Sequence, residues 1–430
     1  MARDTIYAVS SGPVPAGVAV IRMSGPGVRF GLETMLGTVP EPRLAALRPI
    51  RDRNGQLLDR GLVLFFAGPA SFTGEDVAEL QVHGGRAVVA AVLAALAELP
   101  GHRAAEAGEF TRRAFENGRA DLTEVEGLAD LIAAETEAQR RQALLQAEGG
   151  LATQLRIWSE ALLHVRAMLE AGLDFVDEED VPTSVIASAV AEARRLAQEM
   201  DALLSASAFG ERVRSGFDVV LLGPPNVGKS SLLNALAQRE AAIVTAEPGT
   251  TRDLIEVALD IDGYAVTLVD TAGLRDTAGL VEREGIERAR RRSTSADLVL
   301  LLDDGEQPPV EPPAGVVALT VRTKIDRSGA MPCGLAVSAV TGTGLDDLRR
   351  AIGAALGLAE RRPDALIVRE RQRQGITAAR DALAAIDPGQ PPELIAEELR
   401  RAADALGRVS GRTGVEDLLG AIFGSFCIGK

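Results

Sequence analysis

The chain has 430 residues, of which 46% are hydrophobic and 25% are charged, with two cysteines and a formal net charge of −15. Its length exceeds one hydrophobic core and predicts about three domains, and the cysteine content excludes a disulfide framework. The acidic balance argues against a broad basic surface for nucleic acid, although a local basic patch stays open. The first residues lack an apolar signal segment, and the longest apolar stretch, 87–97, is shorter than the roughly 20 residues that span a bilayer. We therefore expect a cytoplasmic protein with no membrane partner.

Short strand-like and helical segments alternate over residues 1–118. Residues 18–21 and 62–66 are apolar and rich in Val, Leu, Ile and Phe, which predicts two strands. Residues 87–99 predict a helix, which the Pro100-Gly101 pair ends. We therefore expect an N-terminal α/β domain.

The composition becomes helical after this first domain. Residues 121–170 and 185–204 are rich in Ala, Leu, Glu, Gln and Arg at helical spacing, which predicts long amphipathic helices packed as a bundle. Strand and helix patterns then alternate, and helical composition returns near the C-terminus, broken at 387–392. Helical segments on both sides of an α/β module predict that the module is inserted into one helical domain. The expected boundaries are 119–213 for the first helical part, 214–368 for the inserted module and 369–430 for the second helical part.

A phosphate-binding loop opens the inserted module. Residues 223–230 read Gly-Pro-Pro-Asn-Val-Gly-Lys-Ser and fit the pattern Gly-x-x-x-x-Gly-Lys-Ser/Thr. An apolar run, 218–222, precedes the loop and a helical run, 231–236, follows it. That strand–loop–helix setting makes a chance glycine-rich turn a poor explanation.

Four residues of this loop suit the binding of a polyphosphate and its metal ion. Gly223 and Gly228 allow the backbone to wrap a polyphosphate with its N–H groups pointing inward at a helix N-terminus. Lys229 can reach the β- and γ-phosphates, and the Ser230 hydroxyl can ligate Mg²⁺. The loop therefore predicts a nucleoside triphosphate site.

Later motifs follow in the order that a guanine-nucleotide-binding domain requires. A threonine in Gly249-Thr250-Thr251-Arg252-Asp253 can complete the Mg²⁺ shell only when a γ-phosphate is present, which makes that loop a switch. In Asp270-Thr271-Ala272-Gly273, Asp270 would hold Mg²⁺ through its outer coordination shell, and the Gly273 N–H would sense the γ-phosphate.

The last two motifs select the base. In Thr323-Lys324-Ile325-Asp326, the Asp326 carboxylate can accept both the ring N–H and the exocyclic amine of guanine. Adenine has no such pair of donors at that edge. Ser338-Ala339 predicts a loop beside the base. Together and in order, the motifs favour GTP over ATP.

Two positions depart from the usual GTPase pattern. Thr323 stands where many GTPases have Asn, and it keeps a hydroxyl but loses the amide, so we expect a weakened base or loop contact. Leu274 stands where Ras-like enzymes have the Gln that orients the attacking water. The catalytic group must therefore come from elsewhere. Glu282 or Glu284 could position water, or both could be solvated surface acids.

Asn226, inside the phosphate loop, has two interpretations. Its amide oxygen could help to bind a monovalent cation beside the β- and γ-phosphates, which would supply charge in place of an arginine finger. Alternatively, it caps the turn.

These motifs resemble the MnmE (TrmE) family of tRNA-modification GTPases over essentially the whole chain. The resemblance also rests on Ser71–Asp76, on Gly108–Phe115 and on the C-terminal Phe-Cys-Ile-Gly-Lys of 426–430. It implies an N-terminal domain over 1–118 that dimerises and binds a tetrahydrofolate, a central helical domain, and an inserted Ras-like P-loop GTPase domain. It also implies hydrolysis stimulated by potassium when two GTPase domains of a homodimer meet.

The resemblance further implies partners and a product. The flavoprotein MnmG would join the protein in a heterotetramer-type complex. Together they would form 5-carboxymethylaminomethyluridine at the wobble position of certain tRNAs, with the folate supplying a one-carbon unit. Because the chain is acidic, we expect a basic partner to carry most of the tRNA phosphate contacts.

Residue roles also follow from the resemblance. It favours Glu282 over Glu284 as the residue that orients water, it places Thr251 on Mg²⁺, and it links Cys427 to modification. Cys427 could otherwise be a small buried residue. The implied potassium site consists of Asn226, Thr245, Glu247 and Thr250. The predicted catalytic residues are Glu282, Lys229 and Cys427. The predicted GTP site consists of Gly223, Asn226, Val227, Gly228, Lys229, Ser230, Ser231, Thr245, Thr250, Thr251, Asp270, Gly273, Thr323, Lys324, Asp326, Ser338 and Ala339.

The N-terminal segment departs from the family. Residues 10–17 lack the arginine of the family's Pro-Pro-Gly-Arg-Gly-Gly stretch. Arg22 and Arg119 are then candidate anchors for the anionic folate tail, with salt bridges as the alternative role. Two other functions stay open, namely a ribosome-assembly or signalling GTPase, and a folate enzyme in which the GTPase domain is a passive dimerisation clamp.

Overall fold

A computed structural model describes residues 4–174, 183–239, 255–270, 292, 294–308, 310–327, 334–359, 364–413, 416–424, 426 and 429. The chain divides into two compact units, which are described separately. The first consists of Met1–Ala129, Ala152–Ser159 and Ala403–Lys430, and the second of Asp130–Leu151 and Glu160–Ala402. Among the residues described, no helix combines the length and the apolar character that a membrane crossing needs.

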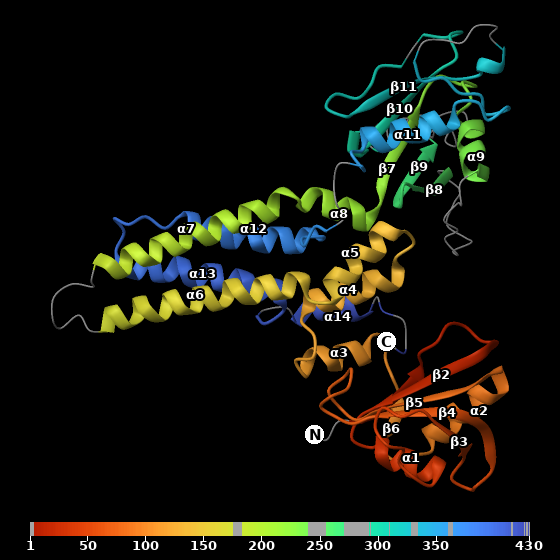
Figure 1. Ribbon diagram of the computed structural model, residues 1–430, viewed down its shortest axis with the longest axis vertical. Helices are drawn as coiled ribbons and strands as arrows, with labels where there is room; N and C mark the ends of the chain where they lie inside the picture. The colour runs from red at the N-terminus through yellow and green to blue at the C-terminus, as the bar shows by residue number, and fades with distance from the viewer. Residues whose placement is uncertain are drawn as a thin grey trace, which may run out of the picture. The chain divides into compact units, whose positions relative to one another are not determined.

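The N-terminal part of the chain forms a six-stranded sheet in the order β3-β4-β5-β2-β1-β6 (Figure 1). All neighbouring strands are antiparallel except β1 and β6, which are parallel. Its elements are β1 (Thr5–Val9), β2 (Ala16–Ser24), α1 (Val28–Leu36), β3 (Ala46–Arg51), β4 (Leu57–Phe66), β5 (Val77–Gly84), α2 (Arg86–Ala97), β6 (His102–Ala104) and α3 (Glu109–Glu116). The predicted strands over 18–21 and 62–66 and the predicted helix over 87–99 are confirmed by β2, β4 and α2.

Alternation along the strands decides which face of this sheet is buried. In β2, Ala19, Ile21 and Met23 are buried while the residues between them are more exposed, as the period of two in a strand requires. The inward residues pack with apolar residues of α1 and α2 into one core. The opposite face therefore keeps apolar side chains that these helices do not cover.

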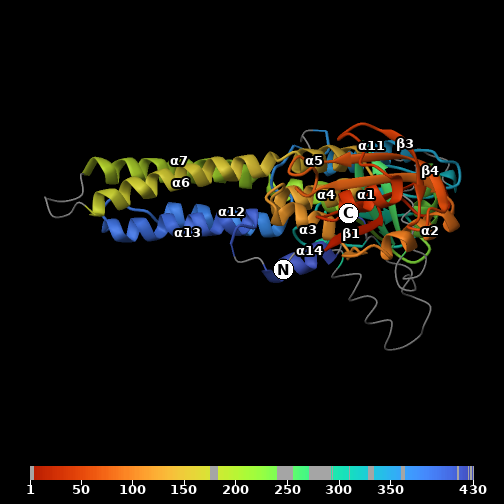
Figure 2. The same ribbon diagram turned by 90° about the horizontal axis from the view of Figure 1, so that it is seen from below.

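Helices make up most of the remaining chain. They are α4 (Leu122–Ala133), α5 (Glu137–Ala147), α6 (Gly150–Asp174), α7 (Thr183–Ser205), α8 (Ser207–Ser215), α12 (Glu370–Ala384), α13 (Pro392–Ser410) and α14 (Glu416–Gly424). The long helices α6, α7, α12 and α13 run side by side in both views (Figures 1 and 2). Because α7 packs against α12, segments from both sides of the α/β module build one bundle, as predicted.

The helical stretch predicted over 121–170 is divided into three helices. The break before α5 occurs at Thr136, whose side chain accepts from the Gln139 N–H while the Gln139 side chain binds the Thr136 backbone. This capping box starts a new helix. The break before α6 occurs at Gly149, whose φ of +83° suits glycine.

The inserted module is a five-stranded sheet in the order β11-β10-β7-β9-β8. Strands β7, β9, β10 and β11 are parallel, and β8 is antiparallel to β9. Its elements are β7 (Phe217–Leu222), α9 (Lys229–Arg239), β8 (Ile255–Ile261), β9 (Tyr264–Asp270), β10 (Leu298–Asp303), β11 (Ala318–Arg322), the 3₁₀ turn η2 (Ile325–Arg327) and α11 (Leu345–Ala355). Apolar residues of all five strands, α9 and α11 share one core.

Candidate nucleotide-binding site

The predicted nucleotide motifs lie at one edge of the inserted sheet. Strand β7 is central, and the chain continues to β9 on one side of it and to β10 on the other. A parallel sheet opens a crevice at the carboxyl ends of its strands where the order reverses in this way. The phosphate loop follows β7, Asp270 ends β9 and Thr323 follows β11. The topology therefore brings three motifs that are distant in the sequence to one edge.

Backbone geometry shapes the phosphate loop. Asn226 and Gly228 have φ values of +62° and +104°, a left-handed conformation that turns successive N–H groups toward one side. At Gly223 a Cβ would lie 2.7 Å from the Leu302 carbonyl oxygen, so the loop can approach β10 only with glycine there. Lys229 Nζ donates to the Gly223 and Pro224 carbonyls at 2.8 and 2.9 Å. The ammonium group is thus held over the loop.

A hydroxyl and a carboxylate meet beside this loop. Ser230 Oγ donates to Asp270 Oδ2 at 2.6 Å, and Asp270 is fully buried. Within the described part of the chain, no group of three or more His, Cys, Asp or Glu side chains could hold a metal ion. One hydroxyl and one carboxylate are oxygen donors that suit Mg²⁺, an ion that usually takes its other ligands from phosphate oxygens and water.

Two of the residues predicted to recognise the base contact each other. Ser338 Oγ donates to Asp326 Oδ1 at 2.6 Å. This hydrogen bond is the main cause that lowers the pKa of Asp326, and it fixes one oxygen of the carboxylate. Lys324 Nζ lies 2.7 Å from Asp304 Oδ2, which orients the Lys324 side chain. Ala339 is half-buried next to Ser338.

Thr323 connects the base segment to the phosphate loop. Its Oγ1 donates to the Val227 carbonyl at 2.7 Å, and the residue is only 5% exposed. Val227 lies between the two left-handed residues, so this bond restrains the turn that presents the N–H groups. The threonine therefore makes a loop contact through its hydroxyl, where we expected a weakened one.

Asn226 is exposed, and its side chain has no hydrogen-bond partner among the described residues. No contact in that part of the structure supports the turn-cap interpretation. Ser231 follows Ser230 in the first turn of α9 and is exposed.

Several predicted site residues lie outside the described residues. They are Thr245, Glu247, Thr250, Thr251, Gly273, Leu274, Glu282, Glu284 and Cys427. Their roles stay predictions.

Arg22, a candidate folate anchor, already has a carboxylate partner. Its Nε and Nη2 donate to Glu79 Oε1 at 3.0 and 2.8 Å, and its guanidinium lies 5.9 Å from the ring centres of Phe72 and Phe110. The other candidate, Arg119, is exposed, and its side chain runs along Gly74. An anionic ligand at Arg22 would therefore compete with Glu79, beside the rings of Phe72 and Phe110.

The two N-terminal motifs that carry the family resemblance are joined by an ion-pair network. Arg113 binds Glu75 at 3.0 Å and Glu109 at 3.0 Å, and Arg103 binds Glu109 at 2.6 Å. Burial alone raises the pKa of Glu109, but hydrogen bonds from Arg103, the Glu106 N–H and Arg113 outweigh it and lower the pKa to about 2. These ion pairs therefore hold the 71–76 loop against α3.

Gly429, within the C-terminal motif, contacts the start of the N-terminal segment 10–17. Ser10 Oγ donates to the Gly429 carbonyl at 2.6 Å. Gly429 has a φ of +105°, and a Cβ there would lie 2.1 Å from the Val9 carbonyl oxygen, so this close approach requires glycine.

Sequence reasoning missed one polar cluster. Gln139, Gln142 and Gln146 on α5 each donate to a backbone carbonyl near the root of the inserted module, meaning the two chain segments that join it to the helical bundle. Their spacing of three and four residues places them on one helical face, and this spacing was the signal available in the sequence.

The chain was compared with known families and proteins. Residues 5–119 match the family described as the GTP-binding protein TrmE N-terminus, and residues 122–427 match the MnmE helical domain. The tRNA modification GTPase MnmE of Rhizobium meliloti is 52% identical over 440 residues, covering 100% of both chains. The protein of that name from Azorhizobium caulinodans is 53% identical over 434 residues, covering 99% of both. A solved G domain of the T. maritima FeoB iron transporter is 26% identical over 32% of this chain and 98% of its own, with a TM-score of 0.24.

Proposed function

Because the chain belongs to the MnmE family of tRNA modification GTPases, we propose that its inserted module, hereafter the G domain, binds Mg²⁺·GTP at the phosphate loop. The protein is a GTP hydrolase that acts in tRNA modification. One observation carries the proposed site: the Ser230–Asp270 pair and the Asp326–Ser338 pair lie at the same edge of one sheet. The first pair would bind the phosphates and the metal ion, and the second pair would bind the guanine base.

The described residues would bind the nucleotide as follows. Backbone N–H groups around Gly228 face the β-phosphate, and Lys229 exchanges its loop carbonyls for phosphate oxygens, which are stronger acceptors for an ammonium. Ser230 and Asp270, with Thr251, would hold Mg²⁺, which offsets charge on the β- and γ-phosphates. Asp326 would accept from guanine while the hydrogen bond from Ser338 orients its carboxylate.

For hydrolysis we propose that Glu282 orients the attacking water. The oxygen of that water bonds to the γ-phosphorus while the bond to the β–γ bridging oxygen breaks, giving GDP and phosphate. Leu274 carries no polar group for this task. Asn226, Thr245, Glu247 and Thr250 would hold K⁺, which supplies positive charge near the phosphates. The exposed and unpaired Asn226 amide within the described residues supports this role.

We propose that the protein works as a homodimer through the N-terminal sheet. Leu47 and Leu62 are neighbours in register on β3 and β4 and are 66% and 41% exposed, and Val18 on β2 is 56% exposed. They lie on the face that α1 and α2 leave uncovered. Two copies facing each other would bury this apolar surface, and a tetrahydrofolate would bind near Arg22 and Arg119.

The substrate we propose is tRNA, modified at the wobble uridine to 5-carboxymethylaminomethyluridine. The partner is the flavoprotein MnmG, in a heterotetramer-type complex in the cytoplasm. The acidic net charge of −15 supports a division of labour in which the partner binds most tRNA phosphates. The functional divisions are those predicted from the sequence: 1–118, 119–213, 214–368 and 369–430.

The experiment is complementation of cells that lack this protein, with wobble-uridine modification measured by mass spectrometry of tRNA. The wild type is expected to restore modification. The Glu282→Ala variant is expected to bind GTP, fail to hydrolyse it and fail to restore modification. A variant that restores modification without hydrolysis would instead favour a passive clamp, and a wild type without effect on wobble uridine would contradict the proposal.

A further inference from the structure

Helix α5 holds both chain segments that join the G domain to the helical bundle. Gln142 Nε2 donates to the Gly210 carbonyl at 3.1 Å, and Gln146 Nε2 donates to the Leu366 carbonyl at 2.8 Å. Gly210 lies in α8, which leads into β7, and Leu366 lies in the segment that leads out to α12. The two glutamines are 2% and 1% exposed, so both bonds are shielded from water.

The two joining segments are also tied to each other. Arg214 Nε donates to the Val368 carbonyl at 3.0 Å, and Gln139 Nε2 donates to the Arg214 carbonyl at 3.2 Å. A side chain at Gly210 would place its Cβ 2.4 Å from the Ile367 carbonyl oxygen, so the segments touch through their backbones. The root of the G domain is therefore one tightly bonded unit that includes α5.

The first turn of α5 contacts the core of the G domain. The Ala138 N–H donates to the Gly263 carbonyl at 2.9 Å, and Ala138 is part of the apolar core of the inserted sheet. Beside it, the rings of Phe209, Phe217 and Tyr264 lie with centres 5.7 to 6.2 Å apart. Gly263 lies in the turn of the β8–β9 hairpin and Tyr264 begins β9, so α5 is packed against that end of the hairpin.

The opposite end of the same hairpin reaches the nucleotide site. Ile255 pairs with Asp270 at that end, and Ile261 pairs with Tyr264 at the turn. Each strand has seven residues, so the hairpin spans about 20 Å. A regular two-stranded ladder that is part of a larger sheet moves as a body. A shift of Asp270 therefore reaches α5 through paired strands.

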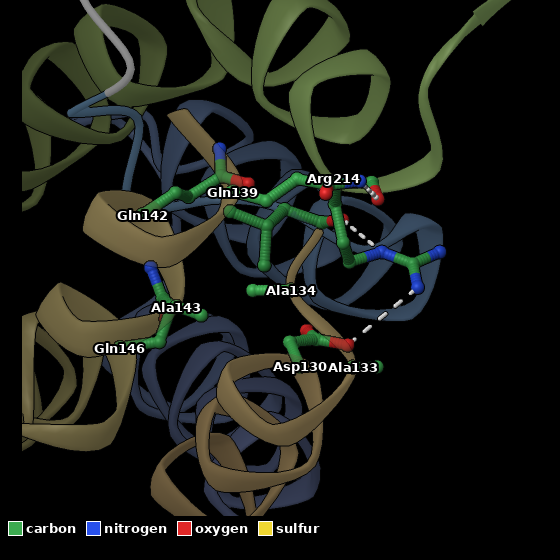
Figure 3. A pocket seen from close by; sticks show the side chains of 9 residues that line it. Asp130, Ala133, Ala134, Gln139, Gln142, Ala143, Gln146 and Arg214 are labelled. Atoms are coloured by element: carbon green, nitrogen blue, oxygen red, sulfur yellow. Dashed lines mark hydrogen bonds and ion pairs between the residues drawn. The ribbon is translucent and has the colours of Figure 1, made fainter. Parts of the chain in front are cut away.

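Beside the glutamine-bearing face of α5, the packing leaves a space. A cavity of about 120 Å³ lies between α5, Arg214, Val368 and the end of α4, where Asp130 and Ala133 line it. Figure 3 shows Gln142 and Gln146 on one side of this cavity and Asp130 with Arg214 on the other. The Gln146 Oε1 atom is buried without a hydrogen-bond partner among the described residues. Polar side chains line part of this cavity, so it can hold ordered water.

We propose that α5 is the coupling element of this protein. It moves with the G domain as one body and conveys the nucleotide state from the Asp270 end of the β8–β9 hairpin to the bundle. Two connections carry the movement onward. Only Glu148 and Gly149 separate α5 from α6, and the Val368 N–H donates to Gln372 Oε1 in the first turn of α12. Gln142 and Gln146 act as positioning residues, and the proposal rests on the proposed function because it requires GTP at the phosphate loop.

Hydrogen–deuterium exchange on the full-length protein tests this, with and without Mg²⁺ and a non-hydrolysable GTP analogue. In the wild type we expect slower exchange at 223–232, and a change of about threefold or more in peptides from α5 and from 364–384, which do not touch the nucleotide. In the double variant Gln142→Met, Gln146→Met, protection at 223–232 stays and the response at 364–384 is lost. Methionine has similar length but no N–H donor.

The matched control is Gln374→Met, which removes an exposed glutamine of α12 bonded only to Glu370 among the described residues; it should respond as the wild type does. The double variant should keep its KM for GTP within about twofold while wobble modification falls by about tenfold, a coupling of ordinary size. A wild type in which 223–232 responds and α5 does not would overturn the proposal, even if the double variant fails to fold. So would a double variant that keeps the response at 364–384. No protection at 223–232 in the wild type would refute the nucleotide site itself.

Discussion

Replacing Thr323 by valine removes one hydroxyl and almost no volume. The main bond lost is the 2.7 Å contact from Oγ1 to the Val227 carbonyl, beside a longer one of 3.4 Å to the Asp303 carbonyl, at a residue that is nearly inaccessible to water. Removing the donor from a buried carbonyl costs about 1–3 kcal/mol. Only the part of that cost that falls on the nucleotide-bound state lowers affinity. Since the bond restrains the turn of the phosphate loop, we expect GDP and GTP to bind about tenfold more weakly.

The measurement is calorimetric titration of both nucleotides into the full-length protein with Mg²⁺ present. Thr323→Ser keeps the hydroxyl and should bind as the wild type does. Thr323→Asn restores the residue of other GTPases and should also stay within about threefold, because its amide can donate to the same carbonyl. If Thr323→Val binds both nucleotides as tightly as Thr323→Ser, the hydroxyl does not hold the loop and the reasoning is wrong.

Three further predictions concern Glu109, Asp326 and Asn226. Lowering the pKa of Glu109 from 4.5 to about 2 stabilises the folded state by about 3 kcal/mol above pH 4.5, and this is lost as the pH falls toward 2. In thermal unfolding, Glu109→Gln should be destabilised at pH 7 and lie closer to the wild type at pH 3; an equal gap at both pH values would contradict this. Asp326→Asn should lose at least about a hundredfold in GTP affinity and prefer XTP, whose 2-oxo group accepts from the amide; unchanged GTP binding would remove Asp326 from the base site. The wild type should hydrolyse GTP faster in K⁺ than in Na⁺, and Asn226→Ala should show equal rates; equal rates in the wild type would remove the potassium role.

The nucleotide site could be read from the sequence because its chemistry is local. The phosphate loop, Asp270 and Asp326 each lie in a short motif whose residue types suit one part of the ligand. Their order along the chain then sufficed to predict one site, since parallel strands deliver their carboxyl ends to the same edge. The helical bundle was also predictable, because amphipathic spacing is periodic over many residues.

Contacts between distant residues were decided by the tertiary structure. From the sequence we expected Thr323 to weaken a contact. In the structure its hydroxyl donates to the carbonyl of Val227, 96 residues away in the sequence. The sequence left Arg22 as either a folate anchor or a salt-bridge residue, and the structure pairs it with Glu79. Gln146 donates to the carbonyl of Leu366, 220 residues away in the sequence, and the identity of the glutamine alone does not predict that hydrogen bond. The chemistry of a motif depends on residues that are adjacent in the sequence. The pairing of a donor with a remote backbone carbonyl depends instead on how whole helices and strands pack.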